Sequence, residues 1–269
     1  MKSIQPKLLA QILDEILNEI KEVKLPLSLR AAQLENSPLA VIYFDLIART
    51  MSSLMLLKFA FKNIGDEEEL RALEHGIGIN LRSCLQDRII MNEIMHDLDK
   101  NNGWEDSAKK REVYIKHTSD QLGHILKTLD DLKRRGPLLN GSMDFDELKK
   151  ILVRRFPEYF SDPINYVMHI KYGASVLYSS YEAKNNIRVK EDSGEIFNVW
   201  YRYSKYEHYG PITHELLNRP LEENWNTIIS SLAHIVNGMA YALDIVIQTK
   251  GHQHFLIKKV DELMELCVR

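Results

Sequence analysis

Glycine and proline are scarce in this sequence, which has 12 glycines and 8 prolines among 269 residues. Both counts are well below average usage. Sandwiches and barrels of β-strands need these residues for their frequent tight turns, so the scarcity argues against such folds and favours long helices. Hydrophobic residues make up 45% of the chain, which is enough to form a core and excludes a disordered protein.

Cysteine and net charge are also low. Cys84 and Cys267 are the only cysteines, so the chain has neither a disulfide framework nor a zinc site built from cysteines. The first residues lack the apolar core of a signal peptide, and we therefore expect a cytoplasmic protein. The formal charge is −3, from 35 basic and 38 acidic residues. This charge gives no broad attraction to nucleic acid or to an anionic membrane, so any such contact must be local.

Helical periodicity covers most of the sequence. In the first segment, Leu9, Leu13 and Ile16 lie on one face of a helix that starts near Pro6. Capping residues and prolines set the other boundaries. The expected helices span about 6–25, 38–63, 66–99, 107–135, 144–156, 162–184, 195–209, 222–249 and 254–268, with a polar loop or small hairpin at 185–194 and irregular chain at 210–220.

We therefore predict an all-α fold, a single-domain bundle of about eight to nine helices over residues 1–269. No linker rich in glycine, serine or proline divides the chain, and the one candidate seam lies near residue 140. Gly76 and Gly78 fall inside an expected helix, where glycine lowers helix stability. They predict a kink or a close helix crossing.

The segment 39–61 is long enough to cross a membrane at about 20 residues. However, Asp45, Arg49 and Lys58 interrupt it, and charges at mid-membrane are costly. We expect this segment to be the central buried helix of a bundle, and we expect no membrane contact.

His75, His96 and Asp97 raise the alternative of a metal-dependent enzyme. The pair His96-Asp97 resembles the signature of HD-type metal phosphohydrolases, and His75 precedes it. That resemblance implies a metal held by these three residues and completed by a later Asp, which would activate a water for attack on a phosphate. Asp99 stands where the family pattern has a glycine. We keep this alternative third, and the leading interpretation needs no cofactor.

The chemistry-bearing residues are densest between Trp200 and Pro211, where Tyr201, Arg202, Tyr203, Lys205, Tyr206 and His208 follow one another closely. Arg202 and His208 resemble the motif of the HEPN superfamily (higher eukaryote and prokaryote nucleotide-binding). Its members are all-α domains, and its ribonucleases carry an Arg, four to six residues and a His. The tract also resembles a largely uncharacterised prokaryotic HEPN-like family.

This resemblance implies RNA cleavage without a metal. Arg202 would stabilise the scissile phosphate, and His208 would move the proton of a ribose 2′-hydroxyl. Lys205 would add phosphate affinity, and the rings of Tyr201, Tyr203 and Tyr206 would stack on bases. On a regular helix the side chains of Arg202 and His208 point about 120° apart. The two residues therefore share a site only if the last helical turn distorts, or if a symmetric dimer brings two copies together.

The leading hypothesis is thus a HEPN-like, homodimeric protein that cleaves or binds RNA or a nucleotide, in defence or stress, with a regulatory protein as a further partner. The competing hypothesis is a non-catalytic helical interaction module, in which Arg202 and His208 are structural hydrogen-bonding residues. Arg111 and His117 have the same spacing within a charged segment, so the spacing alone does not decide between them.

Overall fold

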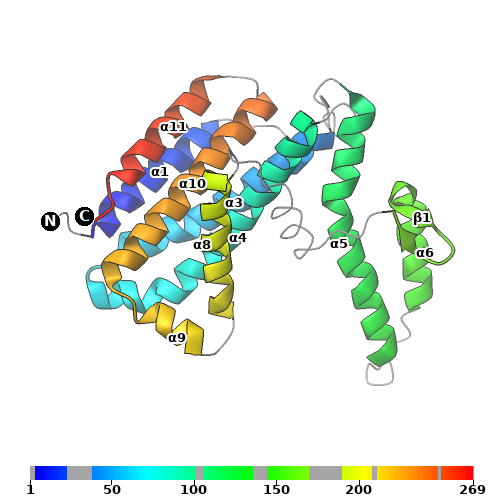
Figure 1. Cartoon of the computed structure of the whole chain (residues 1–269), viewed down its shortest axis with the longest axis horizontal. Helices are drawn as coiled ribbons and strands as arrows, with labels where there is room; N and C mark the ends of the chain where they lie inside the picture. The colour runs from blue at the N-terminus through cyan, green and yellow to red at the C-terminus, as the bar shows by residue number, and fades with distance from the viewer. Residues whose placement is uncertain are drawn as a thin grey trace. The chain divides into compact units, whose positions relative to one another are not determined.

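The computed structural model describes residues 4–22, 38–100, 106–135, 144–169, 190–207, 211–247 and 250–268. Helices dominate these ranges (Figure 1). The strands found within them are the short β1 (Phe160–Asp162) and β2 (Val167–Met168). The prediction of an all-α fold is therefore confirmed.

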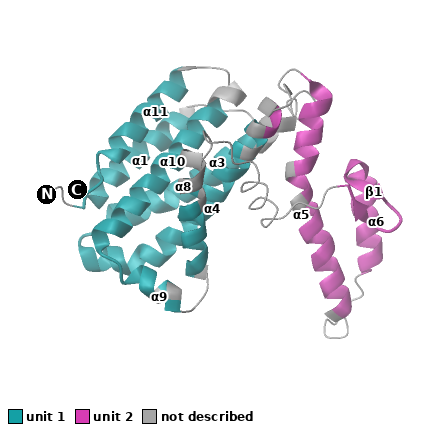
Figure 2. Cartoon of the chain, in the orientation of Figure 1, with its two compact units in different colours: residues 1–95, 187–269 teal, residues 96–186 magenta. Residues whose placement is uncertain are grey.

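The chain forms two compact units, which Figure 2 shows in different colours. The first unit contains residues 1–95 and 187–269, and the second contains residues 96–186. The candidate seam near residue 140 falls within the second unit, at a position outside the described residues. A single domain over the whole chain stays a prediction.

The helices of the first unit are α1 (Pro6–Glu22), α3 (Pro38–Asn63), α4 (Glu67–Lys100, whose last residues belong to the second unit), α8 (Lys190–Ser204), the 3-10 turn η3 (Lys205–Glu207), α9 (Pro211–Leu217), α10 (Leu221–Ile247) and α11 (Lys250–Met264). Helix α10 packs against α11, α3 and α8, and α1 packs against α3 and α11. Trp225 of α10 is fully buried in this core. Its indole Nε1 donates to the Leu266 carbonyl at 2.9 Å, and its ring meets Phe61 edge-on.

Helix α3 is buried along one side. Leu54 and Phe61 are fully buried, whereas Leu56 and Phe59 are 62% and 70% exposed. The expectation of a central buried helix holds for one side of α3 only, because the apolar residues on its second side remain exposed. Within the part of the chain that the structure describes, no helix combines the length and the apolarity that a membrane span requires.

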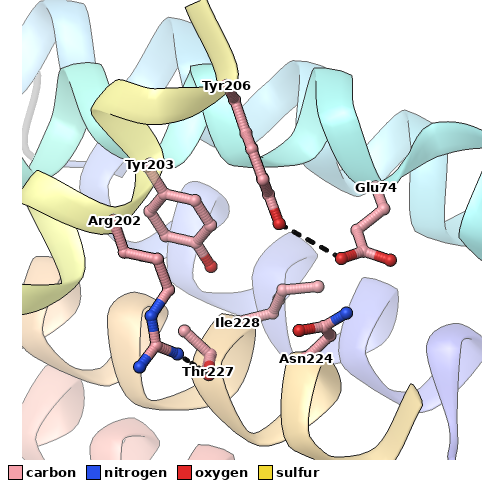
Figure 3. Close-up of a pocket in the computed structure, with 7 residues that line it drawn as sticks. All are labelled: Glu74, Arg202, Tyr203, Tyr206, Asn224, Thr227 and Ile228. Carbon is pink, nitrogen blue, oxygen red and sulfur yellow. Dashed lines mark hydrogen bonds between the residues drawn. The ribbon is translucent and has the colours of Figure 1, made fainter. Parts of the chain in front are cut away.

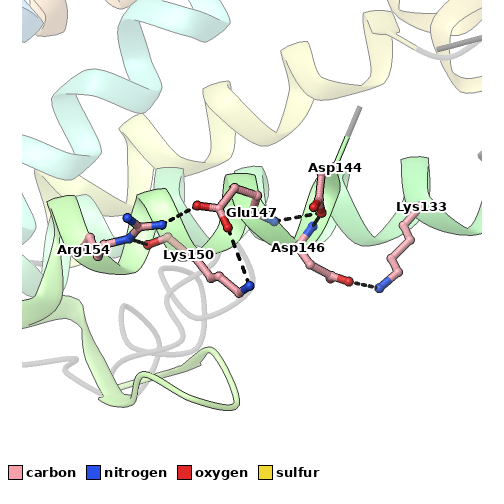
Figure 4. Close-up of polar contacts among 6 residues, drawn as sticks. All are labelled: Lys133, Asp144, Asp146, Glu147, Lys150 and Arg154. Carbon is pink, nitrogen blue, oxygen red and sulfur yellow. Dashed lines mark hydrogen bonds and ion pairs between the residues drawn. The ribbon is translucent and has the colours of Figure 1, made fainter. Parts of the chain in front are cut away.

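The second unit contains α5 (Ser107–Arg135), α6 (Phe145–Arg155), the 3-10 turn η2 (Pro157–Tyr159), β1 and β2. Its core holds Leu122, Leu126, Tyr159, Phe160 and Met168. Asp144 caps α6, because its carboxylate accepts from the backbone N–H groups of Asp146 and Glu147. Residues of α6 form exposed ion pairs, among them Asp146 with Lys133 and Glu147 with Arg154 (Figure 4).

The helix expected at 162–184 does not begin where the sequence predicts it. Residues 160–168 instead form an antiparallel hairpin of β1 and β2. The Asp162 carboxylate accepts from the backbone N–H groups of Ile164 and Asn165, which makes a turn, and Tyr166 has a φ of 56°. A left-handed residue there cannot continue a right-handed helix. Residues 170–184 lie outside the described residues.

Other boundaries differ less. The chain expected to be irregular at 210–220 contains α9, with Pro211 at the first helical position. Helix α8 starts at Lys190 and α11 at Lys250, earlier than the predicted positions 195 and 254. The limits of α3 and α5 match the prediction.

Asp87 of α4 is a buried carboxyl group. Its side chain is 2% exposed, and its Oδ1 lies 3.1 Å from Nη2 of Arg49 on α3, whose side chain is 53% exposed. Burial raises the pKa of Asp87 to about 7, while the charge of Arg49 acts in the opposite direction. Folded and unfolded chains therefore bind different numbers of protons between about pH 4 and pH 7.

In that window the folded protein keeps a proton on Asp87 that the unfolded chain has lost, so the free energy of unfolding falls as the pH rises. Asp87→Asn cannot ionise. We expect this variant to be more stable than the parent protein at pH 8 by about 1–4 kcal/mol, and about equally stable near pH 4. Urea unfolding at both pH values checks this, with the exposed Asp261→Asn as the control. An equal difference at both pH values would contradict it.

Candidate functional site

Helix α8 tightens at its C-terminal end. The α-helix stops at Ser204, and the next turn, η3, is a 3-10 helix. Thr213 of α9 holds this turn by donating from its Oγ1 to the Lys205 carbonyl at 2.6 Å. The last described turn therefore departs from a regular α-helix, which is one of the two conditions under which Arg202 and His208 share a site. His208 itself lies outside the described residues.

Tyr203 and Tyr206 point inward, against α4. Each is 3% exposed, and their ring centroids lie 5.6 Å apart. A Cβ atom added at Gly78 would lie only 2.3 Å from two ring carbons of Tyr206. The absent side chain of Gly78 therefore allows a close approach, which is one of the two alternatives that the sequence leaves open, while α4 continues without a break. Neither buried ring offers an exposed face on which a base could stack.

Glu74 of α4 binds the hydroxyl of Tyr206. The hydroxyl donates to Glu74 Oε1 at 3.2 Å, and Glu74 is itself 3% exposed (Figure 3). Burial raises the pKa of Glu74, although the hydrogen bond from Tyr206 and the charge of Arg71 act in the opposite direction. Burial, followed by the nearby charge of Glu74, also raises the pKa of the Tyr206 hydroxyl. Burial therefore acts against the charged form of each group, and the contact is a hydrogen bond in the core.

His75 also binds η3. Its Nε2 lies 2.6 Å from the Tyr206 carbonyl oxygen, so the ring N–H donates to that carbonyl, and the two rings are 5.7 Å apart. Asp97 instead pairs with Lys116 within the second unit, at 2.5 Å. The side chain of His96 is outside the described residues. Those residues hold no group of three or more His, Cys, Asp or Glu side chains that could bind a metal ion, so nothing described favours the metal alternative.

Arg202 connects α8 to α10. Its Nη1 donates to Thr227 Oγ1 at 3.1 Å. Beside this bond is a small pocket lined by Glu74, Arg202, Tyr203, Tyr206, Asn224, Thr227 and Ile228 (Figure 3). Its volume of about 10 Å³ is close to the roughly 10–15 Å³ that one water molecule needs. The pocket is too small for a base or a sugar, so a ligand of that size would have to contact α8 from its outer surface.

Tyr201 and Lys205 form that outer surface. Tyr201 is 53% exposed, and the Lys205 ammonium nitrogen lies 4.1 Å from the centroid of its ring. This is a cation–π contact, which holds a positive charge beside an exposed aromatic ring. The structure therefore places Tyr201, Arg202 and Lys205 at one helix end and removes Tyr203 and Tyr206 from the surface.

Sequence reasoning missed Glu74, Asn224 and Thr227, which come from α4 and α10 and line the same pocket as Arg202, Tyr203 and Tyr206. Glu74 lies near the start of a helix that begins with many charged residues, so the neighbouring sequence does not indicate that it is buried. The signal that was available is Gly78, one helical turn after Glu74, because glycine inside a helix marks a close crossing.

A scan against protein-family models and searches of curated proteins and of solved structures found no match to this chain. The resemblance to the HEPN superfamily therefore stays a prediction that depends on Arg202 and His208.

The packing at Gly78 predicts opposite effects for two neighbouring glycines. Gly78→Ala should lower the free energy of unfolding by about 1–3 kcal/mol, because the new methyl group overlaps the rings of Tyr206 and Tyr203. At Gly76 an added Cβ meets no described atom within 4 Å, so Gly76→Ala should raise the stability by up to about 1 kcal/mol. Urea unfolding measures both, and shifts of the same sign would show that the close packing is not as described.

Proposed function

We propose that this chain is a HEPN-like protein that binds RNA at the end of α8 and cleaves it without a metal ion. The observation that supports the proposal best is the contact of the Lys205 ammonium with the half-exposed Tyr201 ring, on the helix end that also carries Arg202. In this proposal the protein acts in the cytoplasm as a homodimer, in defence or stress, and a regulatory protein controls it.

Arg202 suits the role of phosphate stabiliser. A guanidinium has five N–H donors, and the bond to Thr227 uses one of them, which orients the group while leaving donors for a phosphate. The ring of Tyr201 supplies a surface for an unstacked base, and Lys205 adds a charge for the backbone.

His208 completes the proposed reaction. As a base it takes the proton of a ribose 2′-hydroxyl, whose oxygen attacks the adjacent phosphorus. The bond from phosphorus to the 5′-oxygen breaks, and the leaving oxygen gains a proton. The products are a 2′,3′-cyclic phosphate and a 5′-hydroxyl, so atoms and protons balance without a metal or a cofactor.

A non-catalytic helical interaction module is the second candidate. The burial of Tyr203 and Tyr206 and the bond from Arg202 to Thr227 favour it, since all three residues already have structural roles. The two candidates differ in what the loss of Arg202 removes. In the module the substitution weakens the contact of α8 with α10, whereas in the nuclease it abolishes RNA cleavage.

The first test is cleavage of mixed RNA in the presence of EDTA. We expect cleavage by the parent protein and a loss of about 100-fold or more in both Arg202→Ala and His208→Ala, the range typical for a catalytic acid or base. Arg111→Ala and His117→Ala are matched controls, because they have the same spacing within α5 and should cleave normally. Absence of cleavage by the parent protein, or equal loss in both pairs, contradicts the nuclease.

RNA binding tests the surface separately. Tyr201→Ala should weaken the binding of single-stranded RNA by about 5-fold to 100-fold, as expected for the loss of one stacked base. Lys205→Gln should reduce the slope of log K against log salt by about 0.7, as expected for one phosphate contact. Normal RNA binding by both variants would remove this surface from the proposal.

A further inference from the structure

A groove runs between α1 and α3, and none of its lining residues belongs to the proposed RNA site on α8. Its lining residues are Lys7, Ala10, Gln11, Asp14, Lys58 and Lys62, and its volume is about 460 Å³. This volume lies within the roughly 300–1,000 Å³ range of pockets that hold small ligands. Three of its six lining residues are lysines.

The groove carries unbalanced positive charge. Lys58 Nζ binds Asp14 Oδ1 at 2.7 Å, which neutralises one of the three lysines. Neither Lys7 nor Lys62 forms an ion pair with any residue that the structure describes. Three lysines and one aspartate leave a formal charge of +2 in the lining. The hydrogen bond and charge of Lys58, with smaller effects of Lys21 and Lys62, lower the pKa of Asp14.

Two glutamates of α1 bind side chains of α11, on the side of α1 that faces that helix. Glu15 binds Lys259, and Glu19 binds His252 at 2.6 Å. Helix α1 contacts both α3 and α11 (Figure 1), and its residues Glu15 and Glu19 bind α11, while Lys7 and Asp14 line the groove with α3. The charge of the groove therefore persists in a chain whose net charge is −3.

Acidic residues also follow α3, at the start of α4. Two of them are engaged locally, because Asp66 Oδ1 accepts from the Glu69 N–H and Glu69 Oε2 accepts from the Gly65 N–H. These bonds cap α4, and neither residue lines the groove.

Lys7 has an unfavourable position if it has no anionic partner. It lies in the first turn of α1, a turn that has no acidic residue. The partial positive charge of a helix N-terminus disfavours a cation and favours an anion. A bound anion therefore relieves the repulsion that the fold imposes on Lys7.

We propose that this groove binds a small phosphate ester with several negative charges, of the size of a nucleoside triphosphate, and that Lys7 and Lys62 hold its phosphates from opposite sides. Ammonium groups on two different helices can contact separate phosphates, and the uncharged Ala10 and Gln11 leave room for the rest of the ligand. The proposal is independent of the RNA site on α8.

The test measures binding of ATP and of inorganic tripolyphosphate to the full chain by isothermal titration calorimetry at low salt. We expect both probes to bind, and we expect the double variant Lys7→Gln, Lys62→Gln to bind at least 10-fold more weakly. The control is Lys258→Gln, whose side chain is 76% exposed on α11, and it should bind as the parent protein does. Equal urea unfolding of the double variant and the parent protein shows that the fold is retained.

Three results would overturn the proposal. The first is no binding of either probe by the parent protein. The second is equal weakening by the double variant and by Lys258→Gln, which indicates general charge attraction. The third is loss of binding in Arg202→Ala, which places the phosphates at the α8 site. The double variant is also tested for RNA cleavage. If it cleaves RNA at the parent rate but has lost ATP binding, the groove and the proposed RNA site act separately, and the failure of one proposal leaves the other standing.

Discussion

The packing of Tyr206 onto α4 is the contact on which the candidate site depends. Gly78 allows the ring to approach the helix, Glu74 binds the hydroxyl, and His75 binds the backbone carbonyl of the same residue. Three neighbouring positions of one helix thus fix one residue of η3. Since Arg202 lies one turn before Tyr206, this anchoring also sets where its guanidinium meets Thr227 on α10.

Burial of Glu74 makes its contact with Tyr206 selective for this fold. A buried carboxyl group without a hydrogen-bond partner is costly, so the fold that provides the Tyr206 hydroxyl is favoured over alternatives that do not. The same packing divides the tyrosines of the tract into two groups. Tyr203 and Tyr206 stabilise the core, and Tyr201 remains available to a partner because it lies on the outer side of α8.

Local sequence signals predict the helices well where each signal is compatible with only one local structure. Pro38 after a serine starts α3, and Asp144 caps α6, as the sequence indicates. The pair Asp162-Pro163 has two readings, because an aspartate can cap a helix or close a turn. The packing of Phe160 and Met168 on α5 decides for the hairpin, and that packing involves residues far away in the sequence. Glu74 was missed for the same reason, since its burial depends on η3 and α10.

Net charge is a poor guide to the anion chemistry of this chain, because the pairing of charges is local. Glu15 and Glu19 of α1 bind side chains of α11, and carboxylates of α6 bind lysine and arginine side chains of the second unit. Cations that lack such partners then create positive surface in a chain with an excess of acids. A value of −3 therefore argues against a broad nucleic-acid interface, but it is compatible with phosphate contacts wherever the fold separates lysines and arginines from their compensating carboxylates.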